Sequence, residues 1–218
     1  GRTSLTAPEG KQVCDAYGIP VPKEGVATTA AAAAKLASGM GYPVVLKIVS
    51  PDILHKTEAG GVLVGVKSAA EVKAGVAKIL ANAKKYNRKA QILGVQVQQM
   101  VGGGQEVIIG AVTDPSFGKL VAFGLGGVLV EVMKDITFRL APATKDDALS
   151  MLDGIAAAEM LKGVRGADPV NRTALAAVIR NVSQLVADFP EIAEMDLNPV
   201  FASKAGAIAA DVRIGCDW

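Results

Sequence analysis

Short apolar runs rich in valine and isoleucine recur along this chain, bounded by glycine, proline and other turn-forming residues, and they limit the folds open to it. Runs of that length and composition are typical of buried β-strands. Turn formers at 114–118 and at 203–206 join consecutive runs, which predicts β-hairpins there. We therefore expect strands over residues 43–48, 62–66, 92–100, 106–112, 120–125, 128–132, 195–201 and 207–214.

Helical segments lie between these runs. An alanine-rich helix is expected to follow Thr28 or Thr29 and to run to about Ser38, and Ser68 can cap the next helix. Because helices and hairpins do not alternate as a regular β-α-β repeat, the order favours a mixed α/β (α+β) fold over a Rossmann sheet. The other expected helices cover residues 7–17, 69–85, 145–161 and 171–189.

Three consecutive glycines at 102–104 can act as a hinge, because glycine tolerates backbone angles that other residues avoid. We expect a small lobe over approximately residues 20–100. A larger lobe is expected over residues 101–218, with the N-terminal helical segment 1–19 belonging to it.

Composition and charge exclude several classes of protein. Half of the 218 residues are apolar, enough for a sizeable core, and the net charge is only +2, which argues against nucleic acid or an anionic membrane as partner. Apolar stretches end before the roughly 18 residues of a membrane span, and the N-terminus has no signal-peptide pattern. The two cysteines lie far apart, so we expect a cytoplasmic protein without disulfides.

His55 is the only histidine, and it lies in a loop with charged residues and two glycines, over residues 50–61. A neutral imidazole can accept a phosphoryl group and pass it on. A solvated loop histidine without a chemical role is the commoner situation, since loops only enrich for function. The residue by itself leaves both interpretations open.

Lys47 lies near the end of an apolar strand, where a buried amine needs a partner anion. It can contact a nucleotide phosphate, or its amine can reach water at the strand end. The glycines at 102–104 and 124–127 permit close approach of a ligand to the backbone. Neither group has the pattern of a P-loop or of a dinucleotide-binding turn.

The C-terminal hairpin carries the strongest signal from the residues themselves. Asp196 and Asn198 lie on one expected strand and Asp211 on the next. If Lys204 and Ala205 form a two-residue turn, Asn198 falls opposite Asp211, and Asp196 shares their face. Three oxygen-bearing side chains on one face suit Mg²⁺, which keeps substrate phosphates as further ligands. An exposed polar sheet face is the alternative, because the arrangement depends on that register.

A larger set of motifs follows one another along the chain with suitable gaps. The motifs are Pro-Val-Val-Leu-Lys at 43–47, Ser-Pro-Asp-Ile-Leu-His-Lys at 50–56, Gly-Gly-Val at 60–62, Val-Gln-Gln-Met-Val at 97–101, Glu106, Phe-Gly at 117–118, residues 124–131, Asp135, Phe-Arg-Leu-Ala-Pro at 138–142 and Asp-Leu-Asn-Pro at 196–199. As an ordered set they resemble the β subunit of ADP-forming acetyl-CoA synthetases over nearly the whole chain. The resemblance implies an ATP-grasp fold over residues 1–218, in which two lobes clasp a nucleotide.

The resemblance also implies a reaction, in which an acid, CoA and ATP are interconverted with acyl-CoA, ADP and phosphate. His55 matches a histidine that carries the phosphoryl group to and from the nucleotide. Lys47 matches a contact to the nucleotide phosphates. Asn198 and Asp211 match Mg²⁺ ligands, in agreement with the hairpin argument.

Other matched residues imply contacts around the nucleotide. Gln98, Gln99, Met100 and Val101 match the linker strand whose backbone reads adenine. Glu106 matches an acidic contact, commonly to the ribose, and Arg139 matches a phosphate contact. Relatives such as succinyl-CoA synthetase often have Glu at the position of Gln98, which leaves a side-chain contact there open.

A CoA-binding and CoA-ligase partner with another phosphohistidine is implied, either as an α subunit or as a domain of a fused chain. ATP or ADP and Mg²⁺ are the implied ligands. A non-catalytic nucleotide-sensing domain, as in fused protein acetyltransferases, is one alternative, and another ATP-grasp ligase is a second. The presence of His55, Asn198 and Asp211 argues against the sensor. The organic acid, the choice of ADP or GDP and the direction of the reaction stay open.

Overall fold

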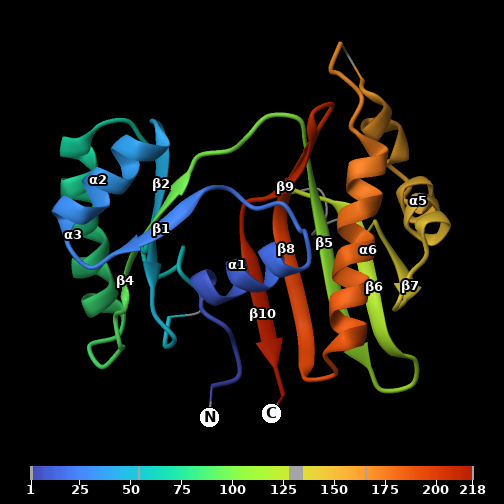
Figure 1. Cartoon of the computed structure of the whole chain (residues 1–218), viewed down its shortest axis with the longest axis horizontal. Helices are drawn as coiled ribbons and strands as arrows, with labels where there is room; N and C mark the ends of the chain where they lie inside the picture. Colours follow the sequence, from blue (N-terminus) through green and yellow to red (C-terminus); the bar gives the residue numbers. More distant parts are fainter. Residues whose placement is uncertain (1, 54, 128–134, 165, 218) are drawn as a thin grey trace.

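The computed structural model describes residues 2–53, 55–127, 135–164 and 166–217. They form two sheets that stand side by side, each packed against its own helices and each with its own hydrophobic core (Figure 1).

The first sheet has four strands in the order β1-β4-β2-β3, all neighbours antiparallel. Helices α2 (Ala30–Met40) and α3 (Ala69–Tyr86) cover the face remote from the second sheet (Figure 1). Strand alternation sends Leu46 and Ile48 into the core under these helices, so Lys47 points to the opposite face. The strands are β1 (Glu24–Ala27), β2 (Val44–Val49), β3 (Val62–Val66) and β4 (Gly94–Gln99).

The second sheet has the strand order β10-β8-β5-β6-β7, and β9 pairs with β8. Its core lies under α5 (Lys145–Gly154) and α6 (Arg172–Asp188), with Phe123 and Leu197 fully buried. The strands are β5 (Gln105–Asp114), β6 (Gly118–Leu125), β7 (Ile136–Leu140), β8 (Ile192–Ser203), β9 (Gly206–Ala209) and β10 (Val212–Cys216).

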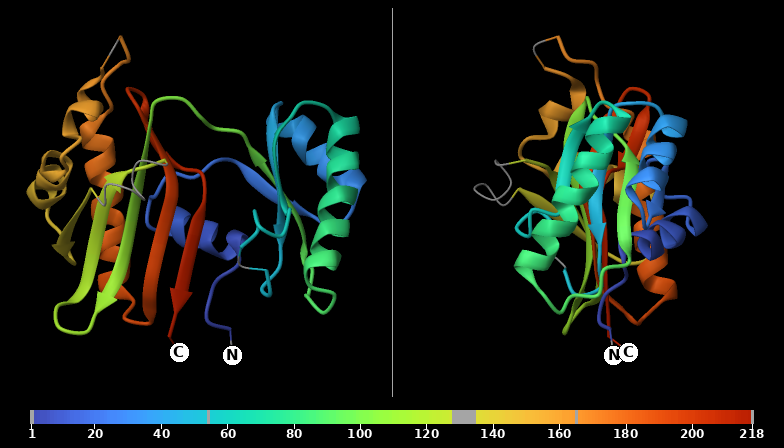
Figure 2. Two further views of the ribbon diagram at one scale, coloured as in Figure 1. Left: turned by 180° about the vertical axis from the view of Figure 1, so that it is seen from behind. Right: turned by 90° about the vertical axis from the view of Figure 1, so that its left-hand side faces the viewer.

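Helix α1 (Ala7–Ala16) lies between the two sheets and packs against β10 (Figures 1 and 2). Its Cys14, and Ile19 just after it, belong to the core of the second sheet. Cys14 and Cys216 are both buried and free.

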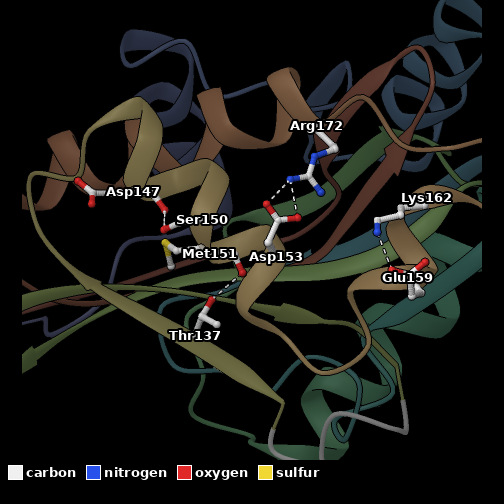
Figure 3. Close-up of polar contacts among 8 residues, drawn as sticks. All are labelled: Thr137, Asp147, Ser150, Met151, Asp153, Glu159, Lys162 and Arg172. Carbon is white, nitrogen blue, oxygen red and sulfur yellow. Dashed lines mark hydrogen bonds and ion pairs between the residues drawn. The ribbon is translucent and has the colours of Figure 1, made fainter.

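Polar contacts fasten α5 to its neighbours (Figure 3). Thr137 Oγ1 on β7 donates to the Met151 carbonyl at 3.1 Å, and Arg172 Nη2 on α6 donates to both carboxylate oxygens of Asp153 at 2.8 Å. These contacts show that Thr137 points to the helix-covered face of the second sheet.

Most predicted elements are confirmed within a few residues, but the helix predicted over 145–161 is shorter than predicted. Helix α5 ends at Gly154 because the Asp135 carboxylate accepts hydrogen bonds from the N–H groups of Ala156 at 2.6 Å and Ala157 at 2.9 Å. A 3₁₀ turn over Ala158–Lys162 follows. The carboxylate stabilises a turn that sequence periodicity does not reveal.

Two further differences concern strands. The strand predicted over 207–214 is divided into β9 and β10 at Ala210 and Asp211, and β1 and β7 were not predicted. The strand predicted over 128–132 lies outside the described residues. In the part of the chain that the structure describes, no helix is long and apolar enough to cross a membrane.

Candidate functional site

A cavity of about 370 Å³ lies between the two sheets and brings together the side chains that carry most of the predicted chemistry. The first sheet contributes Lys47 and Val62, and the loop between β2 and β3 contributes His55, Lys56, Thr57 and Glu58. This loop lies on the side that faces the second sheet (Figure 2). The second sheet contributes Asp196, Asn198, Pro199, Asp211 and Arg213.

The C-terminal hairpin has the predicted register. Val200 pairs with Ala209 in β9, and Leu197 pairs with Val212 in β10. The same register on both sides of the strand break places Asn198 opposite Asp211, and both line the cavity. Two oxygen-bearing side chains therefore meet at the gap between β9 and β10.

Lys47 is only 8% exposed, although it is charged. Its Nζ donates to Asp211 Oδ1 at 2.7 Å and to the Ala210 carbonyl at 2.9 Å. The buried amine thus has the partner anion that burial of a charge requires. This contact links the first sheet to the second at the carboxylate predicted as a metal ligand.

His55 lies at the exposed edge of the same cavity, with 59% of its side chain exposed. Its Nδ1 is 4.0 Å from Oε1 of Glu58. The end of the loop is fastened, because Gly61 N donates to the Lys56 carbonyl at 2.8 Å and Asn82 of α3 donates to the Gly60 carbonyl at 2.9 Å. The imidazole is therefore presented from a loop that is held at its base.

The predicted adenine-reading segment runs from the end of β4 into the linker. Gln98 is buried, and its Nε2 donates to Glu24 Oε2 at 2.9 Å. The N–H groups of Gln99 and Met100 donate to the carbonyls of Lys23 and Pro43 at 2.8 and 3.3 Å. Val101 is the one member of the segment that lies beyond both the strand and these contacts.

Glu106 lies near the start of β5, and its side chain is exposed on the same face as Ile108. The Gly126 N–H donates to the Glu106 carbonyl at 2.7 Å, and a Cβ added at Gly126 would lie 3.0 Å from Glu106 Cβ. Close packing against Glu106 is therefore a structural reason for glycine at position 126, independent of any ligand.

Of the predicted site residues, the cavity brings together Lys47, His55, Asn198 and Asp211, whereas Gln98, Gln99, Met100, Val101, Glu106 and Arg139 do not line it. Arg139 points away from the cavity. Its Nη2 donates to Ser150 Oγ of α5 at 2.8 Å. Arg139 is two residues from Thr137 on β7, so both point to the helix-covered face. The cavity lies on the opposite face of the sheet.

Arg213 is the arginine that lines the cavity, and it was not singled out from the sequence. The spacing offered a signal, because a residue two positions after Asp211 points to the same side of an extended chain. Arg213 lies directly opposite Asp196, and its Nη2 is 3.3 Å from Glu194 Oε1.

Burial raises the pKa of the Asp196 carboxyl; the charges of Asp211 and Glu194 raise it further, whereas that of Arg213 opposes the shift. Protein atoms around this side of the sheet therefore disfavour an extra unpaired negative charge. The negative potential of these neighbouring carboxylates stabilises a cation placed here.

The oxygen ligands at the hairpin suit Mg²⁺, which needs few protein ligands, better than a metal ion whose ligands all come from the protein. Among the described residues, no group of three or more His, Cys, Asp and Glu side chains is arranged to hold a metal ion. Asn198 and Asp211 offer two oxygen ligands. The positively charged Lys47 amine is bound to one oxygen of the Asp211 carboxylate. Mg²⁺ commonly takes few protein ligands and completes its shell with water and phosphate oxygens.

Known proteins that resemble this chain include subunits and longer chains. The β subunit of acetate–CoA ligase (ADP-forming) I of Pyrococcus furiosus is 47% identical over 210 residues, which are 96% of this chain and 90% of that subunit. The 4-hydroxybutyrate–CoA ligase (ADP-forming) of Nitrosopumilus maritimus is 48% identical over 216 residues, 98% of this chain but 31% of that enzyme. This chain thus spans about a third of the longer relative.

Solved structures of acetyl-coenzyme A synthetase 1 from Ca. Korarchaeum cryptofilum have the same fold. The complex with coenzyme A and Ca-AMPCP has a TM-score of 0.96 at 41% identity, covering all of this chain and 95% of that one. Another complex of that protein holds a phosphorylated phosphohistidine segment in a site I orientation. A third holds Mg-AMPPCP, with the segment pointing towards the nucleotide-binding site.

A family model described as an ATP-grasp domain matches residues 1–216. Together with the match over nearly the full length of the Pyrococcus subunit, this shows that the chain belongs to the ATP-grasp family, in the branch that contains the β subunits of ADP-forming acetate–CoA ligases.

Proposed function

We propose that this chain is the nucleotide-binding, phosphoryl-transfer part of an ADP-forming acyl-CoA synthetase, with His55 as the phosphoryl carrier. The observation that carries the proposal is the single cavity lined by His55, Lys47, Asn198 and Asp211, which come from two sheets and a loop. A nucleophile, a cation for phosphate and a pair of oxygen ligands within one space are what phosphoryl transfer from a nucleotide requires.

In the direction that consumes ATP, the bond between the γ-phosphorus and the bridging oxygen breaks. ADP leaves with the electron pair, and a bond forms from phosphorus to Nε2 of His55. The other ring nitrogen keeps its proton throughout, so the ring gains and loses only the phosphoryl group. The reverse reaction returns the phosphoryl group to ADP. Because a neutral imidazole attacks phosphorus with its own lone pair, the transfer needs no general base.

The remaining groups position and neutralise the nucleotide. Lys47 contacts the phosphates as a point charge. Mg²⁺, held by Asn198 and Asp211, supplies further neutralisation of phosphate charge when bound. We place adenine against the linker backbone at Val101 and the ribose near Glu106, while the orientation of Arg139 towards α5 leaves it out of this set.

We propose that residues 20–100 form the small lobe and residues 101–218, with segment 1–19, form the larger lobe. A CoA-ligase partner, separate or fused, completes the reaction. The Pyrococcus relative is a β subunit, and the Nitrosopumilus relative is a longer single chain. The Korarchaeum synthetase holds a phosphohistidine segment that is phosphorylated in one complex and points towards the nucleotide-binding site in another, which supports phosphoryl transfer through histidine in this family.

Labelling with γ-phosphate-labelled ATP tests the proposal. The wild-type chain is expected to acquire an acid-labile phosphoryl group that peptide mapping assigns to His55, and His55→Ala is expected to acquire none. Both proteins should bind Mg-ADP with affinities within about twofold, because the imidazole is not a nucleotide contact. A nucleotide-sensing domain would bind Mg-ADP but never become labelled.

A further inference from the structure

We propose that Arg213 is a further phosphoryl-binding residue of this site, one that contacts the phosphoryl group carried by His55. The inference rests on the proposed function and deepens it. Arg213 lines the same cavity as His55, Asn198 and Asp211, whereas Arg139 lies on the far face of the second sheet.

The position of Arg213 follows from the hairpin. It lies two residues after Asp211 and directly opposite Asp196, so its side chain shares the cavity face with both. It also lines a neighbouring cavity of about 50 Å³ with Ser50 and Lys56, which both belong to the loop between β2 and β3 that carries His55. Arg213 therefore borders the same space as the metal-ligand pair and the loop that presents the imidazole.

Among the described residues, the Arg213 guanidinium has one ion-pair partner. Its Nη2 is 3.3 Å from one oxygen of Glu194, and both side chains are about half exposed, at 49% and 55%. A half-exposed contact of this length is weak and holds one edge of a group that has five N–H donors. A phosphoryl oxygen pair is the better partner, because the planar fork matches phosphate geometry bidentately.

The charge distribution assigns different tasks to the cations of the cavity. Lys47 is bound to Asp211 and reaches the site from the first sheet. Arg213 comes from the opposite sheet, beside Asp196 and Glu194. A phosphoryl group attached to His55 brings two negative charges towards these carboxylates, and Arg213 is placed to offset that repulsion. Arg213 thus favours binding of the phosphorylated loop.

The test compares the rates of His55 labelling from ATP in Arg213→Gln, Arg213→Lys and the control Arg180→Gln, whose arginine is exposed on α6. We expect labelling by Arg213→Gln to slow by about 10- to 100-fold at saturating ATP, with Mg-ADP affinity kept within about twofold. Arg213→Lys should recover part of the rate because it keeps the charge without the fork. Arg180→Gln should label like wild type.

The variant Glu194→Gln distinguishes phosphoryl binding from simple charge balance. If Arg213 only neutralises Glu194, the double variant Glu194→Gln, Arg213→Gln regains the wild-type rate, and the inference is overturned. If Arg213 binds the phosphoryl group, the double variant stays as slow as Arg213→Gln. Normal labelling by Arg213→Gln, or an equal loss of Mg-ADP affinity, also overturns it.

A second measurement separates this inference from the proposed function. Binding of inorganic phosphate to the Mg-ADP complex is measured by phosphorus NMR in His55→Ala, with and without Arg213→Gln. We expect the second substitution to weaken phosphate binding at least about fivefold. If the wild-type chain is never labelled on His55, the proposed function fails. The phosphate-binding measurement then tests the role of Arg213 independently. Equal phosphate binding in the two backgrounds refutes the role of Arg213.

Discussion

Substitution of Lys47 by methionine removes a charge that joins the two sheets at the site while keeping an unbranched side chain of similar size. In the ligand-free protein this deletes the contacts of Nζ with Asp211 and with the Ala210 carbonyl. Hydrogen bonds to charged groups contribute about 1.5–3 kcal/mol, but the Asp211 side chain is 39% exposed, which screens the pair. We expect a loss of about 1–2 kcal/mol, or a Tm lower by roughly 2–8 °C.

The effect on nucleotide binding should exceed that on the fold. We propose that Lys47 exchanges Asp211 for phosphate oxygens, so Lys47→Met should weaken Mg-ADP binding by about 10- to 100-fold. Isothermal titration with Mg-ADP and thermal unfolding measure the two effects. Lys73→Met, at an exposed position of α3, is the control and should change neither. A lowered Tm with unaltered Mg-ADP affinity would refute the phosphate role and leave Lys47 as a structural residue.

Three other substitutions test the structure. The buried Ala143 N–H donates to Ser183 Oγ at 2.6 Å, and Ser183→Ala removes that acceptor. Denaturant unfolding should therefore show a loss of about 1–3 kcal/mol, whereas Ser116→Ala, at an exposed position between β5 and β6, should show almost none. Asp211→Ala should weaken Mg-ADP binding about tenfold or more, and an unchanged dependence of affinity on Mg²⁺ would count against the hairpin site. Because burial raises the pKa of Asp196 in the folded state, the unfolded chain releases this proton first, and stability falls as pH rises between the two pKa values. Asp196→Asn should abolish this fall, so its Tm advantage grows from acid to neutral pH; an advantage independent of pH would contradict the shift.

The local parts of the site were predictable from the sequence because they depend on short-range geometry. A two-residue turn at Lys204 and Ala205 determines antiparallel register over the next several residues, so it brings Asn198 opposite Asp211 without knowledge of the rest of the fold. Likewise, β-branched apolar runs identified β2, β3 and β5 because buried strands require little beyond composition and length.

The missed elements depend on partners far away in the sequence. Strand β1 is only four residues long and is stabilised by pairing with β4, about seventy residues later. Helix α5 stops at Gly154 because a carboxylate from Asp135 holds the next two N–H groups. Neither the pairing with β4 nor the Asp135 carboxylate is visible in the local sequence pattern. The periodicity of apolar residues therefore predicted a helix that was too long.

The sequence by itself determined which residue types could carry the chemistry, since a lone histidine in a glycine-bounded loop and a hairpin with paired oxygen ligands are legible locally. Only the tertiary structure decided which of them meet. Lys47 reaches Asp211 across 164 positions of chain, and Arg213 rather than Arg139 faces the cavity. The physical reason is that the face to which a strand residue points follows from its local twofold alternation, whereas what covers that face depends on how the two sheets and their helices pack.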